Sequence, residues 1–215
     1  MSTTQTKSPF PTRRWWLRVA LWAVAGGLVG YVAADRIEPI ASRLDASQGI
    51  AMVVAWLFAL PGLLVLAGAL SPRLGVALKI FADREAWKDD RAMMVNSGIG
   101  CLLISLFLLS LLAVEPLGLL TAETGLAVTV AVFVAASWFT WRTWALMDEL
   151  WRKVTSEATV IGYYLIFAPG AAWSAAAYLG LARPLGPLDW LSLFLVATLL
   201  GSVIASARRG LIENR

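Results

Sequence analysis

Runs of about 20 apolar residues recur along this chain, and they restrict its fold more than any other feature of the sequence. About 20 helical residues are needed to cross the ~30 Å hydrocarbon layer of a membrane. Backbone N–H and C=O groups must be paired within lipid, so each run is expected to form a helix. The sequence therefore predicts an all-α protein, a polytopic transmembrane helix bundle of six spans. The six runs are 15–34, 49–70, 93–114, 124–146, 158–181 and 188–207.

The amino-acid composition supports a membrane protein and removes several kinds of chemistry. Charged residues are 15% of the chain, against roughly 25% in soluble domains. The sequence has no histidine, and Cys101 is its single cysteine, so an intramolecular disulfide and a cysteine-rich metal cluster are excluded. No P-loop, G-x-S-x-G or H-E-x-x-H motif is present. We therefore predict no cofactor, no metal and no enzymatic activity.

The distribution of basic residues predicts the orientation of the chain. All but three of the 18 Lys and Arg lie near the two termini or around the links after the second and fourth runs. Because cytoplasmic loops collect Lys and Arg, both termini are predicted to be cytoplasmic, in a multi-pass protein of a bacterial inner membrane. The same rule explains the net charge of +4 without a nucleic-acid partner. Residues 1–14 are predicted to be disordered, and residues 208–215 to form a cytoplasmic tail.

A charged segment, MDELWRKVTSEA (147–158), separates the fourth and fifth runs. Asp148 and Arg152 are four residues apart, and the next acid and base repeat this spacing. An acid placed N-terminal to a base in this way stabilises a helix by about 0.2–0.5 kcal/mol per pair, so the spans are predicted to extend as helix beyond the membrane. A turn is still required, near Asp148 or within 154–157. Asp148 and Arg152 are also candidate functional residues.

The link after the second run, residues 71–92, is predicted to contain an amphipathic helix. Its apolar positions, among them Leu74 and Phe81, are flanked by Lys79 and Arg84 at the polar edge. Such a helix can lie in the headgroup layer of the membrane, or it can cover the cytoplasmic ends of the bundle. The sequence leaves both arrangements open.

Two segments near helix starts resemble one another. DDRAMMVNSG (89–98) and DELWRKVTSE (148–157) share three identities in ten positions. A parallel repeat, in which the second and third spans match the fourth and fifth, would resemble the pseudo-symmetric construction of many transporters. An acidic pair near a helix start also complements the helix dipole without any repeat, and we favour this second interpretation.

Polar residues within or beside membrane spans are the default candidates for function. Glu157 comes directly before the fifth run, Tyr164 lies on the same predicted helix face, and Asn96 enters the third run at an equivalent depth. Glu157 could pair with Arg152 or Lys153, or it could face a cytoplasmic vestibule. Together with the Tyr164 hydroxyl, a titrating Glu157 could handle a proton or a cation. A glutamate in this position also commonly marks no more than the beginning of a span.

Helix-breaking residues and small residues define two further kinds of candidate. Pro61 and Pro169 interrupt the second and fifth runs near mid-membrane, and paired interruptions are typical of transporter sites. Kinked helices also occur in bundles that have no substrate. Gly26 and Gly30 form a GxxxG motif in the first run, and APGAAWSAAA (168–177) is a second small-residue surface. Small residues allow helices to approach closely, within one chain or between subunits.

Three stretches resemble a group of small six-span inner-membrane proteins of alphaproteobacteria, sphingomonad-like in character. These stretches are DELWRKVTSEATVIGYYLIF (148–167), PLDWLSLF (187–194) and ARRG (207–210). The resemblance extends over most of the chain, and its motifs are structural landmarks. It implies the six-span topology but no activity, because the group is uncharacterised.

The leading hypothesis is a non-catalytic accessory or assembly protein that contacts the lipid bilayer and a membrane-protein partner, or a second copy of itself. The alternative is a small transporter or channel with a site near Pro61, Pro169 and Glu157. A membrane enzyme is disfavoured because the sequence has no histidine and no convergent acids. Exchanging Glu157 for Gln separates the first two hypotheses, since a transporter that uses this acid would lose its pH dependence.

Overall fold

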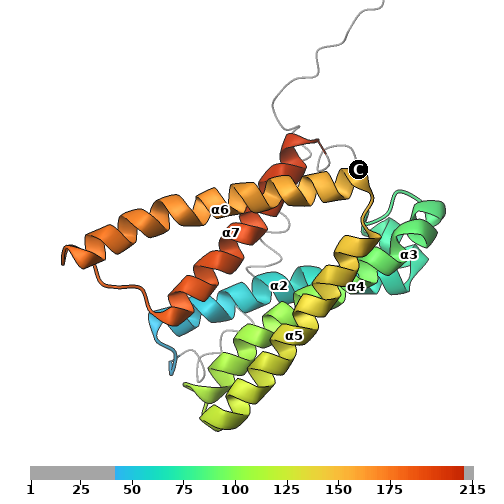
Figure 1. The fold of residues 1–215 in the computed structure, drawn as a ribbon. Helices are drawn as coiled ribbons and strands as arrows, with labels where there is room; N and C mark the ends of the chain where they lie inside the picture. The colour runs from blue at the N-terminus through green and yellow to red at the C-terminus, as the bar shows by residue number, and fades with distance from the viewer. Residues whose placement is uncertain (1–41, 211–215) are drawn as a thin grey trace, which may run out of the picture. The chain divides into compact units, whose positions relative to one another are not determined.

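A computed structural model of the protein describes residues 42–210. The predictions made for 1–14, for the first span at 15–34 with Gly26 and Gly30, and for the last residues of the tail lie outside this range. The described residues form helices and no strand (Figure 1). The helices are α2 (Ala46–Leu70), α3 (Pro72–Ala77), α4 (Arg84–Val114), α5 (Ala122–Leu146), α6 (Glu149–Tyr178) and α7 (Pro187–Arg208).

Five of the described helices, α2, α4, α5, α6 and α7, are long and apolar enough to cross a membrane. This confirms the predicted all-α class and a multi-pass membrane protein. The boundaries agree closely with five of the predicted runs, except that α4 and α6 begin nine residues earlier than their runs. At 1.5 Å per residue, α4 and α6 are each about 45 Å long, which is more than a ~30 Å hydrocarbon layer requires. The predicted helical extension is present for the fifth span, because α6 begins at Glu149, but not for the fourth, because α5 ends at Leu146.

Side-chain caps determine where several helices begin. At the start of α2, Asp45 and Gln48 form a reciprocal capping box, with distances of 2.8 and 2.9 Å between side-chain oxygen and backbone nitrogen. Asp83 accepts bonds from the backbone of the first turn of α4. Asp148 does the same for α6, accepting from Trp151 N at 2.8 Å. Such caps satisfy N–H groups that have no partner inside the helix.

Helices α2, α4 and α5 pack side by side in that order. Between α2 and α4, a Cβ atom on Gly62 would lie 3.1 Å from the Gly98 carbonyl oxygen, so these backbones approach closely. Between α4 and α5, the buried Ser110 and Thr129 hydroxyls are 2.8 Å apart. Intramembrane hydroxyls therefore join neighbouring helices at this pair.

Helix α6 packs along α7, and small residues again form the contact. A Cβ atom on Gly201 would lie 2.5 Å from the Ala158 carbonyl oxygen and 3.0 Å from the Gly162 nitrogen. The predicted small-residue surface at 168–177 contributes less, because its Ala171 and neighbouring alanines are exposed. The closest contact of α6 with α7 therefore lies nearer the beginning of α6.

Helix α7 also contacts α2, which links the α6–α7 pair to the other helices. Their shared core contains Val54 and Phe58 of α2 with Leu195 and Leu199 of α7. In contrast, α5 and α6 adjoin at their link and then diverge (Figure 1). A repeat matching α2–α4 with α5–α6 would require the second pair to pack like the first, so the structure does not support the repeat interpretation.

The link at 71–92 differs from the single amphipathic helix expected there. α3 ends at Ala77, Lys79 adopts a φ of 58°, and residues from Arg84 onward already belong to α4. Phe81 is buried, and the Trp87 indole donates to the Ala69 carbonyl at 3.1 Å. The segment therefore folds against the end of α2, as in the second of the two arrangements considered above.

Candidate functional site

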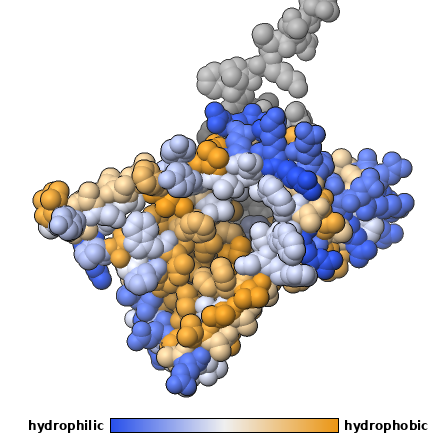
Figure 2. Space-filling view, in the orientation of Figure 1, coloured by the Kyte–Doolittle hydropathy of each residue, from blue (hydrophilic) through white to orange (hydrophobic). Residues whose placement is uncertain are grey.

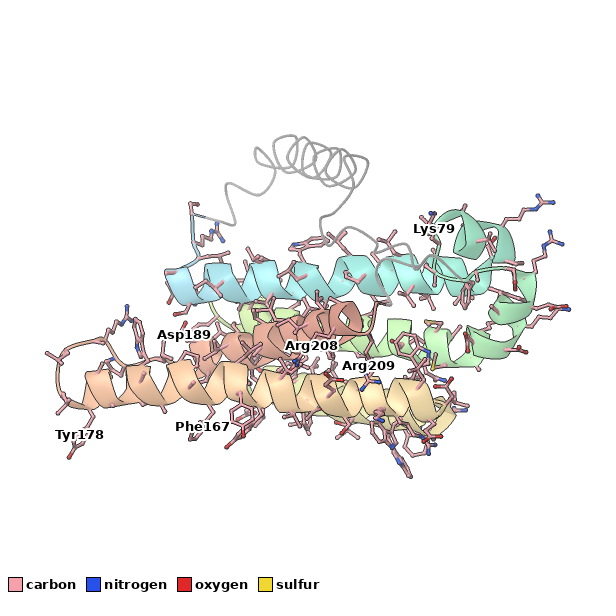
Figure 3. The ribbon with its side chains drawn as sticks, turned by 90° about the horizontal axis from the view of Figure 1, so that it is seen from above. Lys79, Phe167, Tyr178, Asp189, Arg208 and Arg209 are labelled. Carbon is pink, nitrogen blue, oxygen red and sulfur yellow. The ribbon has the colours of Figure 1, made fainter. Side chains whose placement is uncertain are left out.

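Glu157 lies in an ion pair that joins α6 to the end of α7. The Arg209 guanidinium donates from Nε and Nη2 to Oε2 of Glu157, at 2.9 and 2.7 Å. Arg208 Nη1 is 3.7 Å from the other carboxylate oxygen. The side chains of Glu157 and Arg209 are 29% and 27% exposed. Figure 3 shows Arg208 and Arg209 beside α6 at this point.

The ion pair corrects the partner expected for Glu157. The sequence offered Arg152 and Lys153, which precede it on the same helix, as one of two alternatives. They lie five and four residues away, whereas the close α6–α7 contact brings the end of α7 directly to the carboxylate. Sequence reasoning missed Arg209, although its position in the ARRG stretch just after the last span placed it at the same membrane boundary.

Asp148 and Arg152 have structural roles in the α5–α6 link. Asp148 is the N-cap of α6, and Arg152 Nη2 lies 3.5 Å from the Ala145 carbonyl oxygen of α5. Within residues 42–210 these two side chains do not form the expected ion pair. The turn lies at Met147 and Asp148, one of the two predicted positions, because a capping aspartate competes with continuation of the preceding helix.

Asn96 and Tyr164 lie in different environments. Asn96 is buried, and its amide donates to the Ala92 carbonyl of its own helix at 2.8 Å. Tyr164 is 63% exposed on α6, where its ring meets Tyr163 edge-on at 5.4 Å. Tyr163 in turn stacks on Phe167 at 5.5 Å. These three aromatic residues are called the tyrosine face below; Figure 3 shows Phe167 projecting away from the other helices.

The structure does not bring the two proline breaks to one site. Helices α2 and α6 both continue through their prolines. Next to Pro61, Gly62 packs against α4. Next to Pro169, a Cβ atom on Gly170 would meet the Trp190 ring of α7 at 3.0 Å. The two breaks therefore face different neighbouring helices.

Glu157 is also distant from Pro169, the break on its own helix. Along α6, Glu157 and Pro169 are twelve residues apart, which corresponds to about 18 Å of helix. The predicted transporter site near Pro61, Pro169 and Glu157 is therefore not assembled as one cluster in the described residues. Glu157 belongs instead to the end of the helices where the basic residues gather.

The helix ends near the α5–α6 link carry most of the charge. Ten of the twelve Lys and Arg in residues 42–210 belong to this end, where α2, α5 and α7 finish and α4 and α6 begin. It is called the basic end below. Figure 2 shows hydrophilic residues gathered there, with smaller hydrophilic groups at the opposite tips and an apolar surface between them.

Near the basic end, α4, α5, α6 and α7 line a partly open cavity of about 190 Å³, called the basic-end cavity. Its lining combines thioethers, hydroxyls and apolar groups, and Thr155 Oγ1 lies 3.6 Å from Met147 Sδ. Sequence reasoning missed this cavity because its residues come from four separate helices. The lining residues are Met93, Met94, Ser97, Thr143, Met147, Trp151, Val154, Thr155, Ala158, Ser202 and Ser206.

A larger groove of about 570 Å³ lies between α4, α5 and α7, and is called the aromatic groove. Its two hydroxyls, Ser137 and Thr140, donate to carbonyl oxygens of their own helix at 2.9 and 2.8 Å. The groove is therefore mostly apolar, and the indoles of Trp141 and Trp144 add two N–H groups to its lining. The lining residues are Ile104, Phe107, Phe133, Ala136, Ser137, Thr140, Trp141, Trp144, Leu191, Phe194 and Leu195.

No group of three His, Cys, Asp or Glu side chains able to hold a metal ion occurs within residues 42–210. Comparison of the chain with protein-family models, with curated proteins and with solved structures gave no match. The fold and the chemistry of the described residues therefore define a multi-pass helical membrane protein.

Proposed function

We propose that the protein spans a bacterial inner membrane six times, with the basic end and both termini in the cytoplasm. Five candidate spans are described, and the apolar run at 15–34 supplies a sixth. The strong excess of Lys and Arg at the basic end supports this orientation, because positively charged loops stay on the cytoplasmic side. The resemblance to small six-span proteins of alphaproteobacteria supports the same topology and remains part of the proposal.

Within that topology, we propose that the protein is a non-catalytic accessory or assembly partner of another membrane protein. The observation that carries this proposal is the tyrosine face of α6. Tyr163 and Tyr164 are 56% and 63% exposed, and Phe167 is similarly exposed. α6 packs along α7 and has no other extensive neighbour within residues 42–210, so no other described helix covers this face.

The chemistry of the tyrosine face favours a protein partner over lipid alone. Tyr164 lies seven residues beyond Glu157 along α6, which is about 10 Å of helix. Its hydroxyl and that of Tyr163 have no hydrogen-bond partner in the described part of the chain. Acyl chains offer no acceptor, and a hydroxyl without one costs free energy in an apolar medium. A neighbouring transmembrane helix can supply both an apolar contact and an acceptor.

The alternative, a small transporter or channel, is less well supported. Such a protein needs polar or charged groups that can exchange partners along a pathway. Glu157 is engaged by Arg209, Asn96 bonds its own helix, and the larger groove is apolar. The proline breaks then remain as the feature that favours transport.

The proposal is tested by extracting the full chain from its native membrane with its lipid and identifying everything that co-purifies. An accessory protein should retain a partner in fixed stoichiometry, and Tyr164→Ala should reduce that retention. Val134→Ala, at an exposed position of α5 away from the tyrosine face, is the matched control. Recovery of the chain without a protein partner, carrying a bound small molecule other than a lipid, would contradict the proposal and favour transport.

A further inference from the structure

The basic-end cavity and the aromatic groove follow the same faces of α4 and α5. Ser97 and Thr143 line the cavity, whereas Ile104 and Ala136, each seven residues deeper along its helix, line the groove. Seven residues are two helical turns, or about 10 Å. α4 and α5 run antiparallel, so seven residues later on α4 and seven residues earlier on α5 are displacements in the same direction. The two hollows therefore lie one after the other along these helices. α7 lines both of them as well.

The cavity is more polar than the groove. An amphiphile needs such a pair of sites, one for its polar part and one for its apolar chain. The groove has apolar walls and hydroxyls that donate to their own helix. In the cavity, the half-buried hydroxyls of Ser97 and Ser206 have no hydrogen-bond partner within residues 42–210, so they remain able to bind a ligand oxygen. A mostly apolar site with a few polar groups is typical of ligand pockets between helices, and 570 Å³ lies within their usual range of roughly 300–1,000 Å³.

A positive charge lies beside the polar hollow, and the apolar hollow is open at its side. Arg208 is 66% exposed and adjoins the Glu157–Arg209 ion pair, next to the cavity residues Ala158 and Ser206. α6 contributes to the cavity but not to the groove. Among the described helices, none therefore closes the groove where α5 and α6 diverge, so within residues 42–210 this side is open to an acyl chain. Figure 2 shows a largely apolar surface in this region.

We propose that the cavity and groove together bind one glycerophospholipid of the leaflet at the basic end. One acyl chain lies in the aromatic groove, the glycerol ester region contacts the cavity hydroxyls, and Arg208 pairs with the phosphate. This inference goes beyond the accessory role, because it concerns a different surface from the tyrosine face and does not depend on a protein partner.

The test reconstitutes the full chain in phospholipid nanodiscs that contain a phosphatidylglycerol with a photoreactive group in its acyl chain. Adducts are then mapped by peptide mass spectrometry, and we expect them to concentrate on the groove residues of α5 and α7. Ser137→Trp fills the groove and should reduce this labelling about tenfold, which corresponds to about 1.4 kcal/mol of binding free energy. Ala131→Trp, at an exposed position of α5 outside the groove, is the matched control and should leave labelling unchanged.

Phe194→Ala is the second variant, in case Ser137→Trp does not fold. Phe194 lines the groove but is largely exposed, so its removal should weaken labelling without loss of the fold. Equal labelling of every lipid-facing helix, insensitive to both variants, would overturn the proposal. Equal competition by a long-chain alcohol and by unlabelled phosphatidylglycerol would overturn the assignment of the phosphate to Arg208.

Discussion

Lys79 has a backbone conformation that favours glycine. Its φ is 58°, and it follows α3 at the position where helices often end in a left-handed residue. Two bonds complete this ending, from Lys79 N to the Val76 carbonyl at 3.0 Å and from Ile80 N to the Gly75 carbonyl at 2.9 Å. A side chain with a Cβ atom costs about 1–2 kcal/mol in this conformation.

Lys79→Gly is therefore expected to stabilise the protein by about 1 kcal/mol. The free energy of unfolding in mixed micelles is the quantity to measure. Leu78→Gly is the control, because φ at Leu78 is −78° and glycine relieves nothing there. Loss of stability in Lys79→Gly, equal to that of the control, would show that Lys79 is not in the left-handed region.

The Glu157–Arg209 ion pair should contribute measurably to stability. A double-mutant cycle with Glu157→Gln and Arg209→Gln is expected to give a coupling free energy of about 1 kcal/mol. This is the upper part of the range for accessible ion pairs, because two donors of one guanidinium reach the carboxylate. The coupling should fall at high salt. Glu149→Gln is the control for loss of an acid from α6. A coupling of zero would mean that the pair does not hold α7 to α6.

At the scale of helix pairs, the α6–α7 contact depends on small residues. Gly201→Ala should destabilise the protein by about 1–3 kcal/mol, the usual cost of overpacking, because the new Cβ would lie 2.5 Å from the Ala158 carbonyl oxygen. Unfolding of the purified protein measures the change. Gly49→Ala is the matched control, since nothing lies within 4 Å of its Cβ position. Equal effects of the two substitutions would contradict the close helix contact.

The helices were predictable because their physical cause is local. Length and apolarity predict all five spans within residues 42–210. Asp148 marks the start of α6, because aspartate is a common N-cap residue and can be recognised in the sequence. Contacts between helices depend on residues far apart in the chain, so the Arg209 partner of Glu157 was not predicted. A signal did exist for the α6–α7 contact, since the residue pairs 158/162 and 197/201 share one Ala-xxx-Gly spacing.

The α3 segment shows a different limit of sequence reasoning. Its apolar residues fit a helical pattern, but a break near Lys79 lets Phe81 turn back onto the end of α2. A close glycine contact permits this fold, because a Cβ on Gly75 would lie 2.7 Å from the Gly68 carbonyl oxygen. Periodicity alone does not reveal such a tertiary contact.

At the scale of the whole molecule, the proposed topology predicts which loops face each compartment. In a Cys101→Ala background, Ser156→Cys near the basic end should react with a membrane-impermeant maleimide only after permeabilisation. Leu119→Cys and Leu181→Cys, in the loops of the opposite end, should react in intact cells. Reaction at position 156 in intact cells would reverse the proposed orientation.

The proposed accessory role requires that the tyrosine face of α6 contacts another membrane protein. A photoreactive amino acid placed at Tyr164 of the full chain in living cells tests it most directly, with the same residue at Val134 of α5 as the control position. A protein adduct of one defined mass is expected at Tyr164 and none at Val134. Adducts with lipid alone at both positions would contradict it.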